Sequence, residues 1–131
     1  MIVVPDSNVI VSALNFGTAM SSPVLALDKA VKSRAIATCD EIEGEIRRIL
    51  TAKFEWSPQR VEQALGRIFE SVIRVEIHGT VRLCRDPDDD KILECAERTH
   101  ASWIVTGDRD LLSLGSYGGI RIVSPAEYLR L

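Results

Sequence analysis

The sequence predicts an α/β fold in which helices cover both faces of a parallel sheet. Short, continuously apolar runs alternate with longer segments whose apolar residues recur at helical spacing. Two of the apolar runs also end at an acidic residue, Asp6 after residues 2–5 and Asp108 after residues 103–107. Because the carboxyl ends of parallel strands face the functional crevice, these acids are expected to lie together there.

Five segments are expected to form strands. Residues 2–5 are a continuous apolar run typical of a strand buried on both faces, and three further short, mainly apolar segments are expected to form strands at residues 35–38, 102–105 and 120–123. Residues 72–77 alternate apolar with charged residues, which predicts a strand with one exposed face. The Gly118-Gly119 pair predicts a turn before the last strand.

Helices are expected between and after the strands, and most of their starts carry a capping signal. Serine or aspartate N-caps, most of them followed by proline, stand at Ser22-Pro23, Asp40, Ser57-Pro58, Asp86-Pro87 and Ser124-Pro125. Glu43 and Glu127 are expected to complete capping boxes with Asp40 and Ser124. Two shorter helices are expected near residues 8–14 and 111–112.

Length and composition indicate one folded domain covering residues 1–131. No run of apolar residues is long enough to span a membrane, and the first apolar stretch resembles a strand more than a signal peptide. The cysteines Cys39, Cys84 and Cys95 are odd in number and lack C-x-x-C spacing, so we expect free thiols and a cytoplasmic protein.

The net charge of −3 neither requires nor excludes a nucleic-acid substrate. If the four acids proposed below are set aside as a metal site, the rest of the chain carries +1. Bound divalent cations would then offset the charge of the site itself.

A set of carboxylates is the main chemical signal. Besides Asp6 and Asp108 it contains Glu45, at the edge of a helical apolar stripe, and a cluster of four aspartates at 86–90. The helix dipole favours Asp89 and Asp90 in the first turn of the helix that follows, but with Asp86 as its N-cap one or two carboxylates remain beyond what capping requires. Converging carboxylates repel one another unless a divalent cation neutralises them. The pattern therefore predicts a metal-dependent site for phosphodiester chemistry.

Each acid also has a structural explanation that the sequence leaves open. Asp6 and Asp108 can form turns or cap helices, and Glu45 can be an ordinary surface residue, with Glu41 one turn earlier as an alternative. The nearby basic residues Arg47 and Arg48 are more typical of a solvated face than of a phosphate site. No P-loop, G-x-S-x-G or G-x-G-x-x-G motif is present.

Four motifs in this order make the chain resemble the PIN domains, in particular the PIN-type toxin components of prokaryotic toxin–antitoxin systems. The motifs are residues 5–14 (PDSNVIVSAL), 45–50 (EIRRIL), 86–96 (DPDDDKILECA) and 104–112 (IVTGDRDLL). The resemblance covers nearly the whole chain. It implies a three-layer α/β/α sandwich with a parallel four- or five-stranded sheet.

The resemblance also implies functional positions, carried over motif by motif. Catalytic and metal-binding roles fall on Asp6, Glu45, Asp89 and Asp108, a further metal-binding role on Asp110, and substrate contacts on Ser7 and Asn8. Within the run at 88–90, Asp89 best keeps the spacing of the family, although Asp90 differs from it by only one residue.

The implied activity is a Mg²⁺- or Mn²⁺-dependent endoribonuclease acting on single-stranded or looped RNA. A cognate antitoxin and a homodimer, with helices at residues 22–32 and 57–71 as candidate surfaces, are the implied partners. Alternatives are a PIN-like module that binds RNA or protein without turnover, and a PIN nuclease that is not a toxin. A phosphoacceptor receiver domain fits less well, because it needs an acidic pair after the first strand and a lysine after the last.

Overall fold

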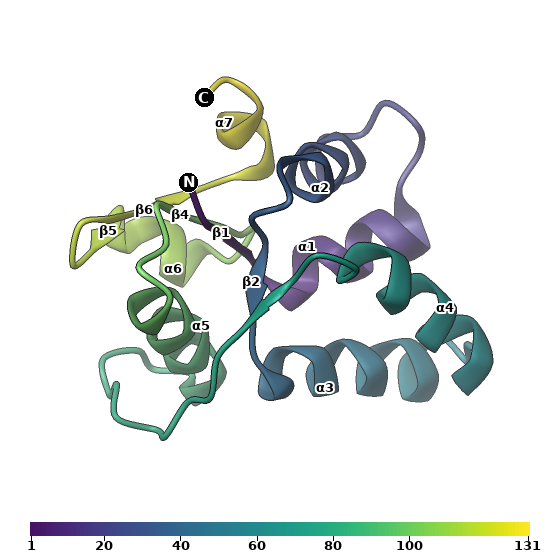
Figure 1. Ribbon diagram of the computed structural model, residues 1–131, viewed down its shortest axis with the longest axis horizontal. Helices are drawn as coiled ribbons and strands as arrows, with labels where there is room; N and C mark the ends of the chain where they lie inside the picture. Colours follow the sequence, from purple (N-terminus) through teal and green to yellow (C-terminus); the bar gives the residue numbers. More distant parts are fainter.

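The computed structural model describes residues 1–131 and has a mostly parallel sheet at its centre (Figure 1). Its strand order is β1 (Val3–Pro5), β4 (Trp103–Val105), β6 (Ile120–Val123) and β5 (Ser116–Tyr117). The first three strands are parallel, and β5 is antiparallel to β6. A second parallel pair, β2 (Ala37–Thr38) and β3 (Ile73–Arg74), continues the sheet beyond β1 through a bridge between Val3 and Ile36.

Helices cover both faces of this sheet, which confirms the predicted three-layer α/β/α arrangement. The helices are α1 (Ser7–Val11), α2 (Ser22–Ser33), α3 (Asp40–Arg48), α4 (Pro58–Ile68), α5 (Pro87–Arg98), α6 (Arg109–Leu114) and α7 (Pro125–Leu129). The wider π-helical turns η1 (Ser12–Phe16) and η2 (Ile49–Lys53) extend α1 and α3. In Figure 1, α2 and α7 lie together above the sheet and α5 and α6 lie below it.

The core forms where the strands meet these helices. Val3 and Val4 of β1 are both fully buried, because β1 is an inner strand covered on both faces. The helices add large, fully buried side chains, among them Ile10, Ile46, Leu50 and Leu93. Burying each such side chain contributes roughly 1.5–3 kcal/mol, and this packing holds the strand ends that carry the acids in fixed positions.

Three of the predicted helix starts are confirmed as N-caps. The Ser57 side chain accepts a hydrogen bond from the Arg60 N–H (3.1 Å), and Asp86 accepts one from the Asp88 N–H (2.9 Å). Ser124 and Glu127 form a complete capping box. Helix α2 begins one residue earlier than predicted, with Ser21 as its N-cap residue.

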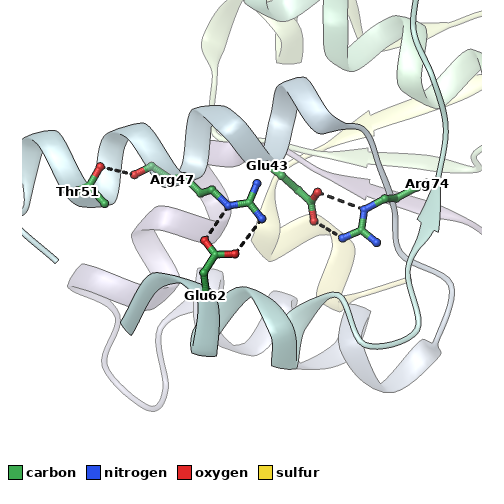
Figure 2. Close-up of polar contacts among 5 residues, drawn as sticks. All are labelled: Glu43, Arg47, Thr51, Glu62 and Arg74. Carbon is green, nitrogen blue, oxygen red and sulfur yellow. Dashed lines mark hydrogen bonds and ion pairs between the residues drawn. The ribbon is translucent and has the colours of Figure 1, made fainter. Parts of the chain in front are cut away.

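The predicted capping pair of Asp40 and Glu43 is wrong. Cys39 occupies the N-cap position of α3, and no side chain caps the helix. The buried Glu43 instead accepts two hydrogen bonds from Arg74 of β3, with Nη2–Oε1 at 2.6 Å and Nε–Oε2 at 3.2 Å (Figure 2). A two-bond pair with a guanidinium is stronger than a bond to a backbone N–H, so this distant partner outcompetes the local cap.

A second ion pair holds α3 from its other neighbour. Arg47 donates two hydrogen bonds to Glu62 of α4, at 2.8 and 3.1 Å, and Thr51 donates to the Arg47 carbonyl oxygen (Figure 2). Arg47 therefore links α3 to α4, and Glu43 links α3 to β3. Glu45 lies between these two contacts in sequence.

Two strand predictions need correction. The segment 72–77 pairs only at Ile73 and Arg74, and both residues are exposed because β3 lies at the sheet edge. Strand β5 was not predicted, since Ser116-Tyr117 has no apolar pattern; the Gly118-Gly119 turn, with φ of 55° and 83°, folds it back onto β6.

All three cysteines are free thiols. Cys39 and Cys95 are buried, Cys84 is half-buried, and none is in a disulfide. No helix in the structure combines the length and the apolar character that crossing a bilayer requires.

Candidate metal centre

The ends of strands β1 and β4 bring Asp6 and Thr106 together. Pro5 and Val105 are paired in the sheet, and the Asp6 N–H donates to the Val105 carbonyl oxygen at 2.8 Å. The Thr106 hydroxyl donates to Asp6 Oδ2 (2.7 Å) and accepts from the Asp108 N–H (3.0 Å). Since the strand order reverses at β1 and β4, this point is where an open parallel sheet forms its functional crevice.

Asp108 caps helix α6 with one carboxylate oxygen. Its Oδ1 accepts hydrogen bonds from the N–H groups of Asp110 (2.8 Å) and Leu111 (3.3 Å). Oδ2 accepts no backbone N–H. The turn also places the Asp110 side chain beside Asp108.

The N-terminus of α5 brings the four aspartates of residues 86–90 to the same edge of the sheet. Asp86 caps the helix, Asp88 pairs with Lys91 at 3.0 Å, and Asp90 accepts the N–H groups of two loop residues, Leu83 (3.0 Å) and Cys84 (2.8 Å). These contacts occupy three of the four aspartates. Asp89 is the one whose carboxylate accepts no backbone N–H and pairs with no basic residue.

Asp89 is only 5% exposed and faces other acids. Its burial, followed by the charges of Asp108, Asp86 and Asp6, raises the pKa of Asp89 to about 7. A buried carboxylate whose neighbours are carboxylates is destabilised when ionised, and a bound cation removes that penalty.

Three carboxylates are close enough to hold one ion. Oxygen atoms of Asp89, Asp108 and Asp110 lie within 4.8 Å of one another. The donors are all oxygens, the type that Mg²⁺, Mn²⁺ and Ca²⁺ prefer, and there is no cysteine or histidine to favour zinc. Donor chemistry and electrostatics therefore both fit a hard divalent cation.

Asp6 borders this group but is held by hydroxyls. It is 2% exposed, and its two oxygens accept from the Ser7 hydroxyl (3.2 Å) and from Thr106. Burial raises the pKa of Asp6, as does the charge of Asp108, while these hydroxyls and the Asn8 backbone N–H lower it. Asp6 is thus oriented by its partners within electrostatic reach of Asp89 and Asp108.

Glu45 lies near the Ser7 hydroxyl, which donates its hydrogen bond to Asp6. It is half-buried on α3, and burial, Asp88 and Asp6 raise its pKa, whereas the nearby Ser7 hydroxyl and the charge of Arg48 lower it. The structure therefore brings Glu45 near Asp6 but outside the three-carboxylate group. Asn8 is exposed at the start of α1.

Two residues near the acids were not predicted from the sequence. Thr106 links Asp6 to Asp108. The sequence feature that could have indicated this role is a threonine at the end of a strand, two residues before an aspartate. Arg85 lies 3.4 Å from Asp110 and carried no sequence signal.

The comparisons with known proteins agree with this geometry. Residues 2–110 match the PIN domain, a span that begins one residue before β1 and contains every acidic residue of the candidate metal centre. No curated protein matches the chain. PIN domains are generally metal-dependent nucleases, and a group of acids able to hold a metal lies within the matched span. The chain belongs to the PIN-domain family.

Proposed function

We propose that this protein is a metal-dependent endoribonuclease whose catalytic residues are Asp6, Glu45, Asp89 and Asp108. The observation that carries the proposal is Asp89, a buried carboxylate that has acids as neighbours and no basic partner. A structural carboxylate in that position would be destabilising without compensation. A cation-binding carboxylate is stabilised when the ion binds.

Each side chain has a separate task in this proposal. Asp89, Asp108 and Asp110 hold a Mg²⁺ or Mn²⁺ ion, with Asp6 and Glu45 completing the site directly or through water. The bound ion supplies Lewis-acid activation of water and neutralises charge on the phosphodiester.

The remaining residues position these groups. Ser7 and Thr106 fix the carboxylate of Asp6, and Thr106 also fixes the backbone of Asp108. The exposed Asn8 contacts the substrate, whereas the buried Ser7 acts on it only through Asp6 and Glu45.

Single-stranded or looped RNA is the proposed substrate, because its exposed backbone can reach a recessed acidic site. The resemblance of the four motifs supports a role as the toxin of a toxin–antitoxin pair in the cytoplasm, with a cognate antitoxin as partner. We further propose that residues 1–131 act as one nuclease domain.

A homodimer is the proposed assembly. An apolar groove of about 260 Å³ lies between η1, α2 and α4 and is lined by Leu14, Val24, Leu27, Val31 and Ile68 among others. Phe16 and Met20, on and after η1, are also exposed. Exposed apolar surface of this kind supports an interface on these elements.

The test is cleavage of a long RNA of mixed structure in EDTA, Mg²⁺ or Mn²⁺. We expect cutting only with metal, and a loss of at least roughly 10²-fold in Asp89→Asn, because metal activation is worth several kcal/mol. Asp88→Asn is the matched control: it makes the same charge change one residue away and should stay within a few-fold of wild type.

Metal binding is measured separately by thermal unfolding. Mn²⁺ should raise the melting temperature by several degrees, and Asp6→Asn should remove that shift. Cutting that persists in EDTA or in Asp89→Asn would contradict the proposal. Metal binding without any cutting would favour a PIN-like binding module that lacks turnover.

A further inference from the structure

Arg85 makes the only ion pair in the structure that reaches the three-carboxylate group. Its Nη2 lies 3.4 Å from Asp110 Oδ1, while the other five ion pairs involve neither Asp89, Asp108 nor Asp110. The positively charged guanidinium of Arg85 therefore lies beside one of the three carboxylates that would hold the proposed metal.

This ion pair is weak compared with others in the same molecule. It rests on one long contact, and the Arg85 side chain is 89% exposed. The Glu43–Arg74 and Arg47–Glu62 pairs each have two hydrogen bonds. Exposed single-contact pairs contribute about 0–1 kcal/mol, so a divalent ion can displace Arg85 from Asp110 at little cost.

The backbone around Arg85 is anchored even though its guanidinium is not. Asp90 accepts the N–H groups of Leu83 and Cys84 at 3.0 and 2.8 Å, and Asp86 caps α5 on the other side. The base of the side chain is thus held beside the site, and only the exposed end can move. No other hydrogen bond ties the guanidinium in place.

We propose that Arg85 is an RNA-contacting residue that exchanges partners when metal binds. In the free protein it pairs with Asp110; once that carboxylate binds the cation, the guanidinium contacts a backbone phosphate of the RNA. Arginine suits this exchange because its planar donors fit carboxylate and phosphate alike. The inference rests on the proposed function, since it takes Asp110 as a ligand and RNA as substrate.

The proposal predicts two effects of opposite sign for Arg85→Ala. Mn²⁺ affinity, measured by calorimetry without RNA, should increase a few-fold, because a competing cation is lost. Affinity for a short fluorescein-labelled single-stranded RNA, measured with Ca²⁺ in the site, should fall about 5- to 10-fold. The salt dependence of RNA binding should also weaken by about 0.7 in log–log slope, the value for one phosphate contact.

Two controls separate this role from a general charge effect. Arg82→Ala removes the same charge from the same loop, where the exposed Arg82 forms no ion pair, and should change both affinities less than twofold. In an Asp110→Asn background, Arg85→Ala should no longer raise Mn²⁺ affinity.

Unchanged RNA affinity in Arg85→Ala, or weaker Mn²⁺ binding, would overturn the proposal. In cleavage assays the variant should raise KM and leave kcat within twofold, as expected for a binding contact. The two binding measurements do not depend on turnover. A wild-type protein that binds Mn²⁺ and RNA without cutting would refute the nuclease while leaving the role of Arg85 testable.

Discussion

Helix α5 carries two buried carboxylates with opposite properties. Glu94 is 1% exposed and Asp89 is 5% exposed. Burial alone would raise the pKa of Glu94, but hydrogen bonds from three loop N–H groups and from Arg98 outweigh it and lower the pKa to about 2. The pKa of Asp89 is instead raised to about 7, because other carboxylates add to the effect of burial.

The difference shows that the partners of a buried acid decide whether the protein itself compensates its charge. The three N–H groups around Glu94 belong to His78, Gly79 and Thr80, at 2.6, 2.9 and 3.0 Å, so this carboxylate fastens the loop to α5. Its charge is fully compensated by the protein. Asp89 has no such compensation, which is why we propose that a cation binds beside it.

The largest effect is expected when Glu94, the carboxylate that fastens the loop to α5, is replaced. Glu94→Gln should destabilise the fold by about 2–4 kcal/mol, since the loop N–H groups and Arg98 lose their charged acceptor. Chemical denaturation measures this loss, and Glu97→Gln, on the same helix but exposed, should cost less than about 0.5 kcal/mol. The refolded Glu94 variant should bind Mn²⁺ within twofold of wild type. A Glu94→Gln variant that keeps normal stability but no longer binds Mn²⁺ would contradict the structural role of Glu94.

A smaller effect, on metal affinity, is expected when Asp6 and Asp108 lose the Thr106 hydroxyl that positions them. Thr106→Val keeps the shape of the buried side chain but removes the hydroxyl that joins Asp6 to Asp108. Mn²⁺ affinity should fall about 10- to 100-fold, the range typical of residues that orient metal ligands. Calorimetry measures the affinity, and Thr106→Ser should restore most of it. Equal affinities in the valine and serine variants would show that Thr106 only fills space.

The sequence predicted those features that depend on local signals. Proline and serine marked the starts of α4 and α7, and short, mainly apolar segments marked the inner strands. The convergence of Asp6 and Asp108 followed from a general rule of parallel sheets, which needs only that both residues follow strands.

Features that depend on distant partners were missed. Glu43 was expected to cap α3, but it pairs with Arg74, 31 positions away. The sequence alone favoured Asp89 over Asp90 only by spacing, whereas the fold separates them physically, because the backbone of residues 83–84 occupies Asp90. Which distant donors reach a given carboxylate can be known only once the positions of the loops are known.

The smallest expected effect is the pH dependence that Asp89 gives to the metal-free protein. Because its pKa is about 7 in the folded state and near 3.8 when unfolded, the folded state binds more protons at Asp89 between these values. Stability from this group is therefore fully present below pH 4 and is lost as the pH rises through about 7. In EDTA, wild type should lose a few degrees more of melting temperature than Asp89→Asn between pH 5 and pH 8.

The comparison with Asp89→Asn isolates this one group. Glu94 does not contribute in this window, because its lowered pKa of about 2 places its own loss of stability at much lower pH. The raised pKa values of Asp6 and Glu45 act in the same direction as Asp89, but both residues are present in both proteins. Mn²⁺ at pH 8 should restore the melting temperature of wild type and leave the variant unchanged. Parallel pH curves for the two proteins would mean that Asp89 is ionised without penalty, and the electrostatic reason for placing a cation beside it would be gone.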